Sequence, residues 1–125
     1  MSSTQTATAG PAFAQALAAK DFDRITQMLD PAIEFRALTP RRQWEADDPR
    51  AVIEILGRWF DENDRIESVE HIDSDAFADR ERVGYRLAVT NPEGSFLVEQ
   101  QAYIGTSDGR IDWMRVVCSG YRPVD

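Results

Sequence analysis

Residues 97–104, LVEQQAYI, and residues 111–118, IDWMRVVC, decide the fold of this chain. The connection between them, GTSDGR, is rich in turn-forming residues, so the whole stretch predicts a long antiparallel hairpin. Alternate side chains of a strand point to opposite faces of the sheet. One face of the first strand is formed by Leu97, Glu99, Gln101 and Tyr103. That face carries a carboxylate, an amide and a phenol in a row, and the row either faces water or lines a cavity.

The length and composition indicate one globular domain. The chain has 125 residues, of which 42% are hydrophobic and 29% are charged, enough for one hydrophobic core. It has no run of about 18 apolar residues that would span a membrane, and its first residues lack the basic and apolar blocks of a signal peptide. The single cysteine, Cys118, excludes an internal disulfide and fits a reducing compartment. We therefore expect a cytoplasmic protein.

Charge and metal-ligand content argue against several classes of function. The net charge is −8 and the isoelectric point is about 4.6, so there is no excess of cations to bind nucleic acid or an anionic membrane. Cysteine and histidine each occur once, as Cys118 and His71, which argues against a zinc site built from the usual ligands. We expect neither a metal nor a cofactor.

The chain begins with a tail and two helices. Residues 1–10 are small and polar and predict a disordered tail, after which Pro11 starts the first helix. Residues 21–29, DFDRITQML, predict a short second helix that either Asp21 or Asp23 caps.

A strand, a loop and a third helix follow. Residues 32–38, AIEFRAL, alternate between apolar and polar types and predict a strand. Residues 39–48 predict a polar loop. Asp48 followed by Pro49 is a strong helix start, and this helix runs to about residue 60.

From there on the hydrophobic period is two. Residues 65–73 and 81–89 predict strands joined by a connection over 74–80, and residues 91–94, NPEG, predict a turn into the hairpin described above. Residues 119–125 have no regular pattern.

The faces of these two strands are partly defined. In the first, the residues that point inward are either Val69 and His71 or Ile66 and Ile72. In the second, one face carries Val83, Tyr85, Leu87 and Val89. Helices followed by four consecutive antiparallel strands predict an α+β fold, with the helices on one face of a curved sheet.

Element order and two motifs carry a resemblance to a known family. DPAIEF, residues 30–35, ends the second helix and opens the first strand, and GRIDWMRV, residues 109–116, looks like the last strand of that family. From Pro11 to Pro123 the chain resembles the ketosteroid-isomerase-like and SnoaL-like proteins of the nuclear transport factor 2-like superfamily. The resemblance implies a single domain over residues 11–125, shaped as a cone in which a curved sheet wraps three helices around an apolar pocket (a cystatin-like α+β barrel). It also implies a homodimer through the outer face of the sheet.

The resemblance gives little support for steroid isomerisation. The general-base aspartate of the ketosteroid isomerases aligns with Phe35, and their second acid aligns with Gln101. Their oxyanion tyrosine has no match, since Phe13 is the nearest aromatic residue. The same alignment turns Glu99, Gln101 and Tyr103 into the pocket. On the last strand it turns Asp112, Met114, Val116 and Cys118 inward, and Trp113 and Arg115 outward.

The candidate catalytic residues are Glu99, Gln101 and Tyr103. A carboxylate inside an apolar cone has a raised pKa and can carry a proton, while the amide and the phenol would polarise a carbonyl or hydroxyl group. In the alternative interpretation the three residues lie on a solvated face or at a dimer contact.

A second set of residues would line the pocket. It comprises Phe35, Trp44, Trp59, His71, Tyr85, Asp112, Met114 and Cys118. Several of them have simpler interpretations: Trp59 as core, Trp44 as a loop residue covering the core, and Cys118 as a small packing residue. Asp112 follows a turn and can be solvated, and a lone histidine on a strand is usually exposed or structural.

The sequence thus leads to two functional hypotheses. The first is a metal-free acid–base enzyme of the isomerase, cyclase or hydrolase type that encloses a small, largely apolar organic molecule, with Glu99 as the proton carrier. The second is a non-catalytic ligand-binding or dimeric interaction domain of the same fold, which the loss of the base at Phe35 suggests.

Overall fold

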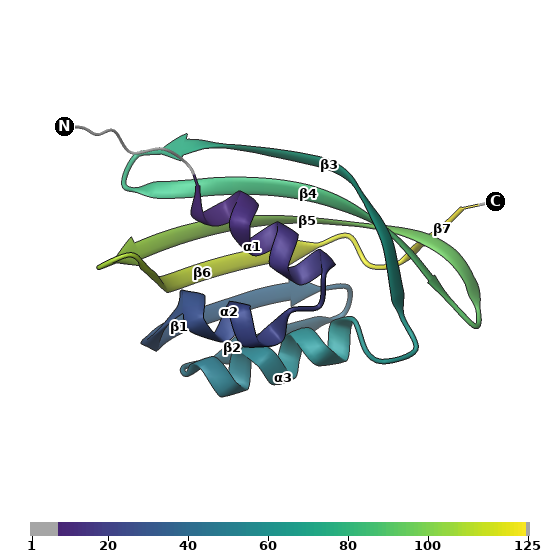
Figure 1. The fold of residues 1–125 in the computed structure, drawn as a ribbon, viewed down its shortest axis with the longest axis horizontal. Coiled ribbons are helices and arrows are strands. Elements are labelled where there is room, and N and C mark those ends of the chain that lie inside the picture. Colours follow the sequence, from purple (N-terminus) through teal and green to yellow (C-terminus); the bar gives the residue numbers. More distant parts are fainter. Residues whose placement is uncertain (1–7, 125) are drawn as a thin grey trace.

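A curved, open sheet carries the helices on one face (Figure 1). The computed structural model describes residues 8–124. Its elements are α1 (Ala9–Ala18), α2 (Phe22–Met28), β1 (Leu29–Thr39), β2 (Arg42–Ala46), α3 (Pro49–Trp59), β3 (Arg65–Phe77), β4 (Arg80–Asn91), β5 (Gly94–Ser107), β6 (Arg110–Cys118) and β7 (Arg122–Pro123). The strand order is β2-β1-β6-β5-β4-β3, and β7 pairs with β5. β1 runs parallel to β6, and the other pairs are antiparallel. The predicted α+β class, the three helices and the four consecutive antiparallel strands are confirmed.

Local capping explains where the helices begin. Asp48 accepts a hydrogen bond from the backbone N–H of Ala51, so the predicted cap of the third helix is confirmed. Of the two alternatives for the second helix, Asp21 is the cap, and it accepts a hydrogen bond from the backbone N–H of Arg24. The first helix begins at Ala9 rather than at Pro11, because a residue distant in sequence caps it. The predicted tail lies outside the described residues up to residue 7.

That distant cap is the carboxylate of Glu81 on β4. Its two oxygens accept hydrogen bonds from the backbone N–H groups of Ala9 and Gly10, at 3.2 and 2.6 Å. A carboxylate at this position both satisfies free amide groups and complements the positive end of the helix dipole. The contact fixes the start of α1 against the sheet.

Residues 42–46, predicted as part of a loop, form the strand β2. Residues 42–46 pair with β1, with Thr39 opposite Arg42 and Phe35 opposite Ala46, so the polar loop predicted over 39–48 is wrong. The turn between the two strands places Arg41 at φ +70°, and Ala46 is buried against the core. A period of two in RQWEA is consistent with this strand, but its polar composition hides the pattern.

The β3–β4 hairpin is longer than predicted. β3 continues through most of the predicted connection to Phe77, and the tight turn falls at Ala78 and Asp79, with Ala78 at φ +53°. At the other end of the chain Arg122 and Pro123 pair with β5, in a stretch that has no predicted structure.

Two irregularities in β3 decide which of its residues face inward. The register with β4 shifts between Ile66 and Ser68 and again between Val69 and His71. As a result Ile66, Val69 and Ile72 all pack against the core, which combines parts of both predicted alternatives. His71 is exposed.

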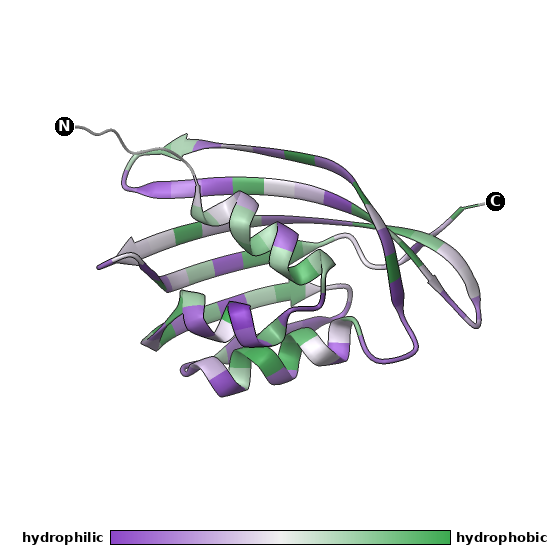
Figure 2. Ribbon diagram, viewed as in Figure 1, coloured by the Kyte–Doolittle hydropathy of each residue, from purple (hydrophilic) through white to green (hydrophobic). Residues whose placement is uncertain are grey.

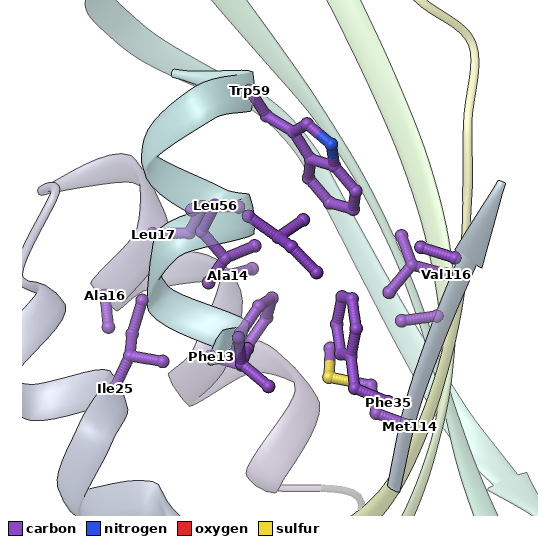
Figure 3. Close-up of a cluster of buried hydrophobic side chains, with 14 of the residues drawn as sticks. Phe13, Ala14, Ala16, Leu17, Ile25, Phe35, Leu56, Trp59, Met114 and Val116 are labelled. Atoms are coloured by element: carbon purple, nitrogen blue, oxygen red, sulfur yellow. The ribbon is translucent and has the colours of Figure 1, made fainter. Parts of the chain in front are cut away.

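The core lies between the sheet and the helices. Hydrophobic and hydrophilic residues alternate along the strands (Figure 2), and the inward set packs against the apolar stripes of α1 and α3. Figure 3 shows Phe13 of α1, Leu56 and Trp59 of α3, Phe35 of β1 and Met114 of β6 meeting in one layer. The interior is therefore rich in aromatic side chains.

Gly10 of α1 lies close against β4. A methyl group at Gly10 would lie 2.6 Å from Val83 Cβ and 2.8 Å from the carboxylate of Glu81, so Gly10→Ala must displace α1 from the sheet. We expect a loss of about 1–3 kcal/mol in the free energy of unfolding, measured by urea denaturation.

Gly57 in α3 is the matched control. A methyl group there meets nothing within 4 Å, and alanine is the better helix former by about 0.8–1.0 kcal/mol. Gly57→Ala should therefore stabilise the protein. If Gly10→Ala were as stabilising as Gly57→Ala, the close α1–β4 contact would be contradicted.

Candidate functional site

The inner face of β5 carries the even-numbered side chains. Val98, Gln100, Ala102 and Ile104 are buried, whereas Glu99 and Gln101 are exposed. The prediction that Glu99, Gln101 and Tyr103 point into a cavity is therefore wrong. The predicted catalytic role of these residues depended on that inward orientation.

An extra residue in the β5–β6 hairpin is the physical reason. Near the turn Ser107 pairs with Arg110, and continuing that register would place Tyr103 opposite Met114. The register shifts at Gly105, which pairs with Trp113, so that Asp112 is the additional residue of a bulge. Beyond the bulge Ile104 lies opposite Met114, and every side chain of β5 is on the face opposite to the one predicted.

The three predicted catalytic residues make contacts on the outer face. The Glu99 carboxylate forms an ion pair with Arg86, 2.8 Å between the charged atoms. The side-chain oxygen of Gln101 accepts a hydrogen bond from Arg82 at 3.3 Å, and its amide nitrogen contacts the Tyr103 hydroxyl at 3.4 Å. These are neighbours on a solvated sheet surface, and each has a partner among the outer side chains.

The inner face holds a buried polar pair instead. Tyr85 on β4 lies opposite Gln100 on β5, and its hydroxyl donates a hydrogen bond of 2.6 Å to the Gln100 side-chain oxygen. Each of the two residues is 1% exposed. Burial, with a smaller contribution from the Cys118 thiol, raises the pKa of the Tyr85 phenol well above its ordinary value, so the phenol stays protonated and acts as the donor.

Two N–H groups in this interior have no partner among the described residues. They are the side-chain amide of Gln100 and the indole of Trp59. The Trp59 ring lies 6.1 Å from Phe35 and 6.0 Å from Trp44, centre to centre, and Figure 3 shows it extending from α3 toward the sheet. Since buried donors in native proteins are nearly always hydrogen-bonded, an acceptor is expected next to each of these two groups.

Cys118 and the segment after it border the same interior. Cys118 is half-buried and lies directly opposite Gln100 on β6, and its sulfur accepts a hydrogen bond of 3.4 Å from the backbone N–H of Gly120. Tyr121 then donates a hydrogen bond to the backbone oxygen of Trp59 at 2.6 Å. The C-terminal segment therefore closes this end of the cone against α3.

Of the predicted lining residues, the structure brings four into the core: Phe35, Trp59, Tyr85 and Met114. Trp44 is half-buried against Trp59, and Asp112 is half-buried at the bulge. His71 is not part of the site, because it lies on the solvent side of β3, 3.4 Å from Asp73. Met114 and Val116 are buried as predicted, and Arg115 contacts Glu34 on the outer face.

Gln100 is the residue that sequence reasoning missed, although a signal for it exists. The predicted turn over 91–94 pairs Asn91 with Gly94, and counting back from that pair places Tyr85 opposite Gln100. Since Tyr85 belongs to an apolar face, its partner must share that face.

A surface hollow of about 450 Å³ lies at the other end of the cone, beside the start of α1. Its charged side chains are already engaged: Glu81 holds the first amides of α1, and the guanidinium carbon of Arg80 lies 4.1 Å from the centre of the Trp113 ring. We therefore assign the candidate site to the interior beside Gln100.

Two further properties concern the described residues, 8–124. No three histidine, cysteine, aspartate or glutamate side chains come together there as a metal site would require. None of the helices in that range combines the length and the apolar character needed to cross a membrane.

Comparison with known proteins supports the fold. No protein-family model matches the chain, and no curated protein is similar to it. Among solved structures, a protein from Rhodopseudomonas palustris provisionally named an isomerase has 18% sequence identity and a TM-score of 0.72, covering 94% of this chain and 93% of its own. A LEH-like epoxide hydrolase from M. tuberculosis has 19% identity and a TM-score of 0.64, covering 88% of this chain and 79% of its own.

A third similar structure is an NTF2-like protein of unknown function from Cytophaga hutchinsonii, with 12% identity and a TM-score of 0.62, covering 91% of this chain and 99% of its own. Identities at this level show the fold alone. The chain has the NTF2-like, SnoaL-like fold that its motifs over 30–35 and 109–116 implied.

The buried phenol predicts how stability depends on pH. In the unfolded chain a tyrosine loses its proton near pH 10, but in the folded chain the pKa of Tyr85 is higher. The free energy of unfolding is therefore unaffected by the ionisation of Tyr85 below about pH 10 and decreases as the pH rises further, because the tyrosine hydroxyl then loses its proton in the unfolded chain and keeps it in the folded one. Burial also raises the pKa of Tyr121, which adds to the fall.

Tyr85→Phe should make this fall shallower by up to about 1.4 kcal/mol per pH unit. Urea denaturation of both proteins between pH 9 and 11 measures the two slopes. Equal slopes would mean that Tyr85 titrates normally and is not held as a buried donor.

Proposed function

We propose that the protein binds one small, largely apolar organic molecule inside the cone, with Gln100 as its central polar contact. The observation that carries this proposal is the Gln100 amide, which is 1% exposed and has no partner for its N–H group although its oxygen is held by Tyr85. An amide held in this way presents a fixed donor to whatever enters the interior.

The energetics of burial support a binding role. A buried amide without a full set of hydrogen bonds costs about 1–3 kcal/mol, and a leucine or methionine at the same place would avoid that cost. A polar residue at the centre of an aromatic interior is the arrangement typical of a ligand site, in which apolar walls give affinity and a few polar groups give orientation.

Proton transfer by Glu99 is not part of this proposal. Among the described residues the fully buried polar side chains are those of Gln100 and Tyr85, both of which are neutral. The second functional hypothesis, a ligand-binding domain of this fold, is therefore favoured over an acid–base enzyme centred on Glu99. The isomerase and hydrolase names of structurally similar proteins are compatible with a small-molecule site in the same interior.

Dimerisation through the outer sheet face stays a prediction. Leu38 on β1 and Val117 on β6 are neighbours in the parallel register, and they are 49% and 54% exposed. This apolar pair lies on the face opposite to the helices, so a partner bound there would leave the interior site untouched.

The test uses the same substitution on the two faces of one strand. Gln100→Leu removes the inner amide, and Gln101→Leu, one residue later, removes an outer one. Each protein is incubated with a small-molecule extract of its source cells and examined by native mass spectrometry, with circular dichroism to verify folding. We expect a bound small molecule on the wild type and on Gln101→Leu, and at least about a tenfold lower occupancy on Gln100→Leu, because loss of one well-placed hydrogen bond costs about 1.4 kcal/mol or more.

Equal occupancy on the two variants would contradict the role of Gln100. Absence of any bound species on the wild type, in extracts prepared under several growth conditions, would contradict the proposed function itself and would favour water as the partner of the buried amide.

A further inference from the structure

We propose that the interior site takes α,β-unsaturated carbonyl compounds and that the Cys118 thiol adds to them. The inference rests on the proposed function, because it uses the same interior and the same amide donor. It adds a chemical class of ligand and a covalent step.

The register places the two groups together. Gln100 and Cys118 are directly opposite each other on neighbouring antiparallel strands and on the same, inner face, where the Cβ atoms of such pairs are about 4.5–5.5 Å apart. On the other side of Gln100, Tyr85 of β4 is its cross-strand partner, and the Tyr85 hydroxyl is hydrogen-bonded to the Gln100 side chain. Tyr85, Gln100 and Cys118 are therefore consecutive neighbours across β4, β5 and β6.

The Gln100 amide and the Cys118 thiol have different chemical capacities. The Gln100 amide is a buried donor without a partner, so it is suited to a carbonyl oxygen. The Cys118 sulfur is half-buried and is thus accessible from outside, and it accepts a hydrogen bond from the backbone N–H of Gly120, which fixes its position. The Gln100 N–H can bind a carbonyl oxygen, and the neighbouring Cys118 sulfur can attack an electrophilic carbon. An α,β-unsaturated carbonyl compound has both in one conjugated system.

The addition balances without any further reagent. Cys118 loses its proton to solvent, its sulfur forms a bond to the β-carbon of the ligand, and the carbon–carbon π electrons move toward the carbonyl oxygen. The negative charge that develops on this oxygen is stabilised by the Gln100 N–H. The resulting enolate takes up a proton from water at the α-carbon, so the net change is addition of S–H across the double bond.

The aromatic side chains define the rest of the ligand. Phe13 lies 6.4 Å from Tyr85, and Phe35 lies 6.1 Å from Trp59, centre to centre, so the walls suit a flat or cyclic apolar body. No lysine, arginine or histidine among the described residues is buried in this interior. A ligand with a carboxylate in place of the carbonyl would therefore lose its hydration without gaining a counter-ion.

The experiment compares two thiol reagents on four full-length proteins. The reagents are 2-cyclohexen-1-one, whose rate of addition rises when its carbonyl oxygen accepts a hydrogen bond, and methyl methanethiosulfonate, which has no carbonyl. The proteins are the wild type, Cys118→Ser, Gln100→Leu and Gln101→Leu. The rate of modification of Cys118 is followed by intact mass and peptide mapping.

The ratio of the enone rate to the methyl methanethiosulfonate rate measures the contribution of the Gln100 amide separately from the exposure of the thiol. We expect modification by the enone on the wild type and on Gln101→Leu, none on Cys118→Ser, and a rate at least about tenfold lower on Gln100→Leu. The rate with methyl methanethiosulfonate should be the same within about twofold on every protein that keeps the thiol, since this reagent reports exposure and intrinsic reactivity.

An unchanged enone rate on Gln100→Leu, a parallel fall with both reagents, or no enone adduct on the wild type would each overturn the inference. The native mass measurement on Cys118→Ser separates this failure from failure of the proposed function. A bound small molecule that persists without the thiol leaves non-covalent binding supported while the covalent step is rejected.

Discussion

One additional residue, Asp112, determines which side chains of the central hairpin face the helices. Because side chains alternate along a strand, the shift at Gly105 moves a whole row from one face to the other. The buried pair of Tyr85 and Gln100, the position of Cys118 across from it, and the ion pairs on the outer face all depend on that shift. Without the bulge, Glu99 and Gln101 would occupy the aromatic interior, where an unpaired carboxylate is costly.

The architecture was predictable from local chemistry and repeating patterns. Asp21 and Asp48 define helix starts through hydrogen bonds to nearby amides, and the apolar alternation from Val83 to Val89 defines the face of β4 that is buried. Features that depend on distant residues were not predictable in the same way. The start of α1 is fixed by Glu81, more than seventy residues later in the chain, and residues 42–46 are a strand because β1 offers them an edge.

The site was only partly predictable for a related reason. Phe35, Tyr85 and Met114 follow from apolar alternation, and the structure places them inside. The choice between Glu99 and Gln100 needs the register of two hairpins at once. The β4–β5 turn gives the correct answer, whereas the β5–β6 turn gives the opposite one until the bulge is counted. A bulge is defined by how two strands pair, so the β5–β6 stretch read alone does not show that Asp112 is the extra residue.

The close approach of Gly10 to Val83 also determines which helix is held more firmly against the sheet. That helix end has no space to move toward the sheet, and its amides are tied to Glu81. α3, in contrast, is tethered at its end by the flexible Lys20 side chain and by the Tyr121 hydroxyl, each bonded to a backbone oxygen. The α1 side of the fold is therefore fixed by close backbone contact with the sheet, whereas the end of α3 is held by the hydrogen bonds of two side chains.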